Sequence, residues 1–277
     1  MYNPVKEAFN RQSELFDAYE EKNEILKRMR RAVREHLLRH LRNGDCILEL
    51  NAGTGMDAVF LAGKGFHVHA IDLSEGMLKK LEAKIILHSL QDNISFELLS
   101  FTELDKLHNK TFDYIFSNFG GLNCEDDLTK VIKHFRLLLK PGGTVTFVIM
   151  PPVCPWEIVL ALKGKFSFAF RRLHGKGSMA NIEGVKFRTY YHSLKKLKIA
   201  MGHEFRLIEA QGLAALSPPP YAVDFPDRHP ALYKFLCVAD ERISHIYPFS
   251  RCADHYIATF KFLPHSNLRG RYWKLKD

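Results

Sequence analysis

Residues 46–72 read CILELNAGTGMDAVFLAGKGFHVHAID, and this stretch decides the fold class. Cys46–Leu50 is a short apolar run typical of buried parallel strands, and Asn51–Gly55 supplies the turn that must follow it. Glycine tolerates a positive φ and the close approach of a ligand, and asparagine enters the left-handed region more cheaply than most residues. The pattern therefore predicts a strand, a glycine turn, a helix over Met56–Ala62 and a second strand over Val68–Ile71.

An acidic residue, Asp72, ends the second predicted strand, roughly 20 residues beyond Gly53. An acid at this distance lies at the tip of the strand beside the glycine turn, where it can accept hydrogen bonds from both hydroxyls of a ribose. The spacing thus predicts a cofactor that contains a nucleoside.

With these residues the chain resembles the class I S-adenosylmethionine-dependent methyltransferases, over about residues 15–150. The family's first motif, acid-x-Gly-x-Gly-x-Gly, matches Glu49–Gly55, with Asn51 in place of the first glycine. A dinucleotide dehydrogenase would need Gly-x-Gly-x-x-Gly to receive a pyrophosphate at the helix N-terminus. Asp57 would repel a pyrophosphate, but it tolerates the sulfonium and ammonium groups of S-adenosylmethionine.

The resemblance implies an α/β fold with a doubly wound, mostly parallel, seven-stranded sheet (a Rossmann-like methyltransferase fold) and an antiparallel last strand. The strands expected after the second are 94–99, 112–118, 144–150, 205–210 and 255–263. The expected later helices are 128–139, stopped by Lys140–Gly143, then 194–201, capped by Ser193, and 231–245.

We expect four segments in the chain. They are an N-terminal helical cap (1–43), the cofactor-binding core (44–150), a helical lid insertion (151–191) and a C-terminal part that completes the sheet and supplies substrate-side loops (192–277). Within the cap, apolar residues recur at helical spacing over Lys27–Arg42, so we interpret the charges of this helix as a solvated face.

The resemblance also implies the cofactor, S-adenosyl-L-methionine, and its product, S-adenosyl-L-homocysteine. Arg28 and Arg31 join Tyr19 as candidates to lie near the methionine carboxylate. For Phe101 two interpretations stay open, packing on the adenine or closing the core. The residues expected to bind the cofactor are Tyr19, Glu49, Asn51, Ala52, Gly53, Gly55, Asp72, Leu73, Ser100, Phe101, Asn118 and Phe119.

Substrate contacts are expected from the second half of the chain. Ligands of doubly wound sheets bind outside the carboxyl ends of the strands, and the insertion after Met150 emerges at that edge. Its aromatic residues favour a lid over an apolar substrate, and the alternative is a scaffold that merely covers the sheet. The residues expected to contact substrate are Trp156, Tyr191 and Tyr221.

Histidine is the side chain best suited to remove a proton from an acceptor at neutral pH. His255, at the start of the last strand, and His192, where the lid returns, are the catalytic candidates, and a structural hydrogen bond is the alternative for each. Neighbouring strand residues point to opposite faces, which argues against Asp254 and His255 acting as a direct pair.

No metal is expected at the site. The ends of the fourth and fifth predicted strands, Ser117–Phe119 and Val148–Pro151, carry no pair of acids, and no cluster of cysteine or histidine has zinc-binding spacing.

Composition fits one α/β domain with insertions, since the 277 residues are 46% hydrophobic. No apolar run is long enough to span a bilayer, the first residues lack the apolar core of a signal peptide, and the five cysteines have no paired spacing. We therefore expect a cytoplasmic protein with reduced thiols and no membrane span. The sequence does not specify an oligomeric state.

The function we predict is methyl transfer to a small, largely apolar or aromatic acceptor at a hydroxyl oxygen. The net charge of +9 raises an RNA or DNA methyltransferase as one alternative. We do not favour a nucleic-acid substrate, because the basic residues of the first long helix are interpreted as a solvated face. A catalytically silent cofactor-binding protein is the other alternative, because Asn51 and a missing adenine-binding acid weaken the family pattern.

Overall fold

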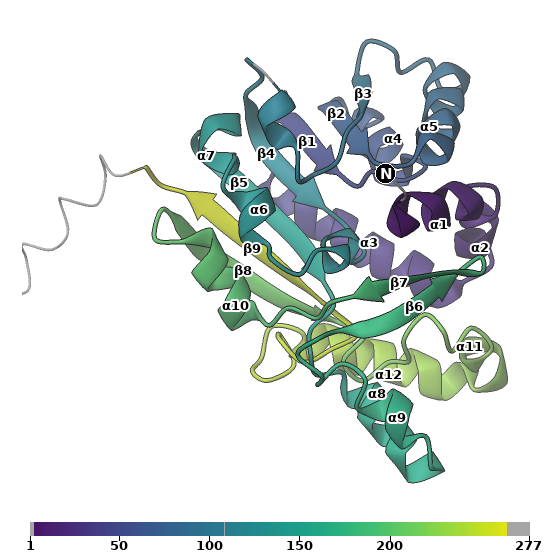
Figure 1. Cartoon of the computed structure of the whole chain (residues 1–277). Helices are drawn as coiled ribbons and strands as arrows, with labels where there is room; N and C mark the ends of the chain where they lie inside the picture. The colour runs from purple at the N-terminus through teal and green to yellow at the C-terminus, as the bar shows by residue number, and fades with distance from the viewer. Residues whose placement is uncertain (1–2, 108, 265–277) are drawn as a thin grey trace, which may run out of the picture.

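The computed structural model describes residues 3–107 and 109–264, and a seven-stranded sheet forms its centre (Figure 1). The strand order is β3-β2-β1-β4-β5-β9-β8, with β9 antiparallel to both neighbours and the pairs from β3 to β5 parallel. This confirms the predicted fold class. The strands are β1 (Cys46–Leu50), β2 (His67–Asp72), β3 (Ile94–Leu98), β4 (Phe112–Ser117), β5 (Leu139–Ile149), β8 (Phe205–Leu213) and β9 (His255–Phe262).

Helices cover both faces of the sheet, as Figure 1 shows. Successive residues of β1 point to opposite faces, so Leu48 joins one core cluster and Ile47 the other. Burial on both faces explains why β1 is apolar throughout. The first cluster packs under α6 (Thr129–Ile132), α7 (Phe135–Leu138) and α10 (Leu194–Met201), and the second under α3 (Glu24–His40), α4 (Met56–Ala62) and α5 (Glu75–Leu87).

The N-terminal helices α1 (Pro4–Gln12) and α2 (Phe16–Glu21) lead into α3. The Asn10 side chain ties α1 to the start of α5, because its Oδ1 accepts from the Ser74 hydroxyl at 2.6 Å and from the Gly76 amide at 3.0 Å. On its other side α1 packs against a two-stranded hairpin, with the rings of Phe9 and Phe187 6.0 Å apart. The helix is therefore held between α5 and the hairpin (Figure 1).

The insertion 151–191 is helical only in its first half, which forms α8 (Pro155–Val159), η3 (Leu160–Lys163) and α9 (Phe166–Ala169). The second half is the antiparallel hairpin of β6 (Ser178–Ile182) and β7 (Val185–Thr189), so the helical character expected of the insertion holds only for its first half. Glu183 and Gly184 form its turn with φ of +48° and +78°, as a two-residue hairpin requires. Alternate residues of β7 are buried against α1.

The predicted helix 128–139 is also wrong in its continuity. It consists of α6 and α7, and the chain leaves α7 at Leu139, which already pairs with Phe112 of β4. Proline disfavours helical geometry in the residue before it, so Lys140 cannot extend the helix toward Pro141. Further along, the predicted helix 231–245 corresponds to α12 (Pro230–Ile243), which follows the short α11 (Phe225–Arg228).

A chain of polar side chains crosses the sheet beneath α3. The fully buried His36 bonds through Nε2 to the Thr259 hydroxyl at 2.6 Å, and hydroxyl contacts continue to Thr146 and Tyr114. The interpretation of the α3 charges as a solvated face is wrong for Arg30, which is buried.

His36 should make the protein lose stability between about pH 6.5 and pH 4. Burial lowers the pKa of His36 to about 4, although Glu209 opposes the shift, whereas an unfolded histidine titrates near 6.5. Between these values the unfolded chain binds more protons, so the free energy of unfolding falls as the pH falls. Thermal melts at pH 7 and pH 5 should show a smaller decrease in Tm for His36→Gln than for the wild type.

His67→Gln is the matched control, because His67 is exposed at the start of β2. Burial also lowers the pKa of His69 to about 4, so a residual slope should persist in His36→Gln. Equal pH dependence in the wild type and His36→Gln would contradict the assignment.

Candidate functional site

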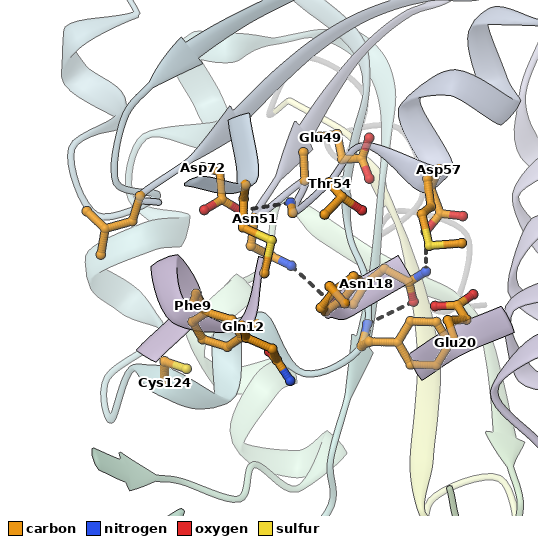
Figure 2. Close-up of a pocket in the computed structure, with 18 of the residues that line it drawn as sticks. Phe9, Gln12, Glu20, Glu49, Asn51, Thr54, Asp57, Asp72, Asn118 and Cys124 are labelled. Atoms are coloured by element: carbon orange, nitrogen blue, oxygen red, sulfur yellow. Dashed lines mark hydrogen bonds between the residues drawn. The ribbon is translucent and has the colours of Figure 1, made fainter. Parts of the chain in front are cut away.

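A cavity of about 370 Å³ opens at the carboxyl ends of β1, β2 and β4. Its floor is the turn after β1, and residues of α1, α2 and α3 form its roof (Figure 2). This is the edge at which doubly wound sheets bind their ligands. The predicted cofactor residues that line it are Tyr19, Glu49, Asn51, Ala52, Gly53, Asp72, Leu73, Ser100, Phe101, Asn118 and Phe119.

Gly55 is a predicted cofactor residue that does not line the cavity. It precedes α4 with a φ of +77°, and a Cβ at this position would lie 2.2 Å from Cδ1 of Leu81 on α5. Its role in the structure is therefore to let the turn pass close to α5, which only glycine allows at this φ.

Asp72 closes the glycine turn from the tip of β2. Its carboxylate accepts the Gly53 amide at 2.8 Å (Figure 2). It also accepts the Ser74 amide at 2.8 Å. Burial raises the pKa of Asp72 even though these backbone bonds favour the charged form. Each carboxylate oxygen has two lone pairs, so acceptor capacity remains on the cavity side for a ligand.

Asn51, which departs from the family's glycine, is accommodated by its own contacts. Its φ is +47°, its Nδ2 donates to the Asn118 carbonyl at 3.0 Å, and its Oδ1 accepts from the Ser117 hydroxyl at 2.6 Å. A Cβ on Gly121 would lie 2.3 Å from the Asn51 side chain. The asparagine thus joins the ends of β1 and β4 in space that Gly121 leaves free.

A buried charged cluster forms one wall of the cavity. Arg30 donates to the carboxylates of Glu20 and Asp57, Arg34 donates to Asp57 at 2.8 Å, and Asn118 Nδ2 donates to Asp57 at 2.7 Å. Burial alone would raise the pKa of Asp57, but the charges of Arg30 and Arg34 hold it below its usual value. Two arginines therefore already neutralise Asp57 within the protein.

Arg30, rather than Arg28 or Arg31, is the arginine of α3 that lines the cavity. Its guanidinium lies 4.7 Å from the centre of the Phe119 ring. Arg28 instead donates to Ser217 and Asp240, and Arg31 is exposed. The two arginines predicted from the sequence, Arg28 and Arg31, lie two positions before and one position after Arg30. Arg30 and Arg34 are four residues apart on one face of the helix, and this spacing was the feature of the sequence that indicated a shared acidic partner.

Glu49 is buried at the end of β1, and its Oε2 has no hydrogen-bond partner among the residues that the structure describes. Burial and the nearby Asp57 raise the pKa of Glu49 well above its usual value, against the opposing charges of Arg30 and Arg34. A buried polar atom without a partner is unusual, so a ligand that donates a hydrogen bond here would complete the site.

Ser100 and Phe101 follow β3 at the cavity edge. The Ser100 hydroxyl is 2.8 Å from the hydroxyl of Thr102. Phe101 lines the cavity and also packs against the first core cluster, and its contact with the adenine stays a prediction.

The two histidine candidates are separated by the fold. His255 lines the cavity, whereas His192 lies outside it and bonds through Nε2 to the Glu125 carbonyl at 2.8 Å. His255 Nδ1 lies 2.9 Å from Asp254 Oδ2, so the expectation that these neighbours do not pair is wrong. Asp254 precedes β9, and the alternation of side chains along a strand does not apply to it.

The predicted substrate residues lie outside the cavity. Trp156 packs against Phe225 with ring centres 5.6 Å apart, Tyr221 packs against Phe168 at 5.5 Å, and the Tyr191 hydroxyl is 2.7 Å from that of Ser178. The sequence predicts an N-terminal helical cap but does not indicate all of its contacts. The lining residues that it missed include Phe9, Gln12, Phe16, Cys124, Met150 and Pro220.

Two groups of described residues have metal-binding side chains within 4.8 Å of one another: His36, His40 and Glu209, and Cys154, Glu157 and Asp254. An arginine contacts the carboxylates of each group, Arg39 in the first and Arg172 in the second. The absence of a metal stays a prediction. Among the described residues, no helix has both the length and the apolar character needed to cross a membrane.

Residues 47–143 match the methyltransferase domain family. Two curated relatives are the demethylmenaquinone methyltransferase of Leptospira interrogans, 32% identical over 50% of this chain and 57% of that protein, and the ubiquinone biosynthesis O-methyltransferase of Thiobacillus denitrificans, 33% identical over 38% and 44%. The chain thus spans little more than half the length of the first of these relatives.

Solved structures share the fold over most of the chain. A putative S-adenosylmethionine-dependent methyltransferase from Listeria monocytogenes aligns with a TM-score of 0.59 and 17% identity over 82% of this chain and 95% of that one. The 1,6-didemethyltoxoflavin-N1-methyltransferase of Burkholderia thailandensis, solved with S-adenosylhomocysteine, aligns with a TM-score of 0.55 and 17% identity over 95% and 92%. The fold is therefore that of the Rossmann-like methyltransferases.

Residues 47–143 therefore carry a methyltransferase domain, within a chain that has the fold of the S-adenosylmethionine-dependent methyltransferases.

Proposed function

We propose that this protein transfers the methyl group of S-adenosylmethionine to a hydroxyl oxygen of a small, largely apolar or aromatic acceptor. One observation carries the proposal: Asp72 and the unpartnered Glu49 face one cavity across the glycine turn. Asp72 would accept hydrogen bonds from the ribose, and Glu49 would accept one from the ammonium group of the cofactor's methionine part. These two acids suit a ligand that is both a nucleoside and a cation.

The acceptor class is proposed from the apolar side of the cavity, where Phe9, Phe16, Phe101, Phe119 and Met150 contribute to the lining. Such a wall favours burial of an aromatic or aliphatic acceptor over a strongly charged one. Two of the relatives are named for menaquinone and ubiquinone biosynthesis, which supports an acceptor of this kind.

The sulfonium of the bound cofactor supplies an activated methyl group, so the protein must align the acceptor and remove its proton. We assign the removal of the proton to His255, which lines the cavity beside Phe119 with ring centres 5.8 Å apart. Its Nδ1 is engaged by Asp254, which leaves Nε2 for the acceptor hydroxyl.

The proposal is tested by adding S-adenosylhomocysteine to the purified protein. We expect saturable binding by calorimetry, and ligand at about 100 times Kd should stabilise the fold by about 2.7 kcal/mol in thermal melts. Radiolabelled S-adenosylmethionine is then offered with a panel of phenols and hydroquinones, and methyl ethers are the expected products. No binding would overturn the proposal.

The other outcomes separate the alternatives. Binding without transfer to any acceptor would indicate a silent cofactor-binding protein. Transfer to RNA, with an affinity that falls steeply as salt is added, would indicate a nucleic-acid enzyme. We also propose a cytoplasmic location, which the five free cysteines support.

A further inference from the structure

A chain of buried charged groups connects the insertion to the edge of the cavity. Arg172, which follows α9, is 3% exposed, and Asp254 is also 3% exposed. Arg172 donates through Nη2 to Asp254 Oδ1 at 2.6 Å and through Nη1 to the Asp254 carbonyl at 2.7 Å. The second oxygen of the same carboxylate, Oδ2, lies 2.9 Å from Nδ1 of His255.

The charges of these connected buried groups are balanced by a second arginine, Arg171. Arg172 also donates through Nε to Glu157 of α8 at 2.8 Å, while Arg171 contacts both oxygens of Glu157 at 2.9 and 2.7 Å. Two arginines thus face two carboxylates. Burial opposes ionisation of Asp254, but His255 and Arg172 hold the pKa of this carboxyl well below its usual range. Asp254 is therefore a carboxylate whenever the enzyme works near neutral pH.

The imidazole of His255 lines the cavity. A Cβ on Gly120 would lie 3.4 Å from His255 Nε2, and Gly120 itself has a φ of +69°. A glycine at this position therefore keeps the approach to Nε2 open.

We propose that Arg172 is a positioning residue that fixes Asp254, so that Asp254 accepts the Nδ1 proton of His255 and leaves Nε2 as the proton acceptor. This inference rests on the proposed function. As the S–CH₃ bond breaks and the O–CH₃ bond forms, the acceptor O–H proton moves to Nε2, the sulfonium becomes a neutral thioether, and His255 becomes an imidazolium opposed by Asp254. The proton leaves to water after the product. The insertion thereby supplies part of the catalytic geometry.

Asp254→Asn tests the orientation directly. Arg172 donates to one side-chain atom of residue 254, so it should select the amide oxygen and turn the amide NH₂ toward His255. Nδ1 must then accept, and the proton moves to Nε2, where it blocks transfer. We expect kcat to fall on the order of 10⁴-fold, as for a histidine held in the wrong tautomer. The Kd for S-adenosylhomocysteine should stay within about 3-fold, about 0.7 kcal/mol.

Nitrogen-15 NMR of the imidazole gives a readout that a merely structural role would not change. In the wild type, His255 should carry its proton on Nδ1, and in Asp254→Asn on Nε2. Spectra of His255→Gln identify the signals. The tautomer can be measured without any acceptor, so failure to find methyl transfer would count against the proposed function and leave the test of Arg172 intact.

Arg172→Met should lower kcat on the order of 10 to 100-fold through misplacement of the base, with a mixture of tautomers. Arg172→Lys should recover part of the rate, and it serves as the second variant if Arg172→Met folds poorly. Arg171→Met is the matched control, because Arg171 contacts Glu157 but makes no hydrogen bond to Asp254 among the described residues. It should keep kcat within about 3-fold, about 0.7 kcal/mol.

Two results would overturn the proposal. One is a folded Arg172→Met protein with the rate and tautomer of the wild type. The other is an equal loss of rate in Arg171→Met and Arg172→Met with an unchanged tautomer, which would mean that both arginines only hold the insertion on the sheet.

Discussion

Asp72→Ala should weaken the binding of S-adenosylhomocysteine by at least about 100-fold. A hydrogen bond to a charged group contributes about 1.5–3 kcal/mol, so loss of two ribose contacts removes roughly 3–6 kcal/mol of binding energy. Part of the loss will come from the protein itself, because Asp72 also holds the amides of Gly53 and Ser74. Calorimetry measures the total, and the Tm of the ligand-free variant measures the part due to the turn.

Glu75→Ala is the control for Asp72→Ala, since Glu75 is a nearby acid that bonds to Lys6 and does not line the cavity. It should bind the ligand as the wild type does. Because burial raises the pKa of Asp72, binding should also weaken as the pH falls toward that pKa, at a higher pH than for an ordinary aspartate. Undiminished binding in a folded Asp72→Ala protein would show that the ribose lies elsewhere.

Of the variants discussed, Arg30→Met should cause the largest decrease in the free energy of unfolding. The substitution leaves Glu20 without its arginine and Asp57 with only one, and both carboxylates are buried. Removing one partner of a buried ion pair costs about 3–5 kcal/mol. For a chain of this size the Tm should fall by roughly 10 °C. Differential scanning calorimetry of the ligand-free protein checks the value.

Two further variants show whether the loss of stability in Arg30→Met is caused by the carboxylate that has lost its arginine. Arg30→Met combined with Glu20→Gln should recover part of the loss, because Asp57 keeps its bond to Arg34. Arg31→Met changes the neighbouring, exposed arginine and should alter the free energy of unfolding by less than about 0.5 kcal/mol. If Arg30→Met were as stable as Arg31→Met, the cluster would contribute nothing to folding.

Much of the sheet could be predicted from the sequence because its signals are local. A strand buried on both faces must be apolar throughout, and the turn after Leu50 needs residues that tolerate a positive φ. Both requirements are visible within 46–72, and this explains why the cavity floor at Asn51 and Asp72 was found correctly.

The errors concern contacts between distant parts of the chain. The hairpin 178–189 has an alternating pattern, but its place is fixed by packing on α1, which is far away in the sequence. Arg30 pairs with Glu20 and Asp57, which come from two other elements. The local pattern of α3 therefore does not indicate which of its arginines lines the cavity. His192, Trp156, Tyr191 and Tyr221 lie outside this cavity, and their roles stay predictions. They were assigned from the topology of strand ends, which predicts an edge of the sheet but not the direction of a side chain.

The position of α1 has a consequence for the timing of turnover. Asn10 fastens this helix to α5, and Phe9 both packs on the hairpin and lines the cavity. Opening of these contacts would ease the departure of a nucleoside product bound beneath that roof. Substitution of Asn10 is therefore expected to change the rate of product release rather than the chemical step, if release limits kcat.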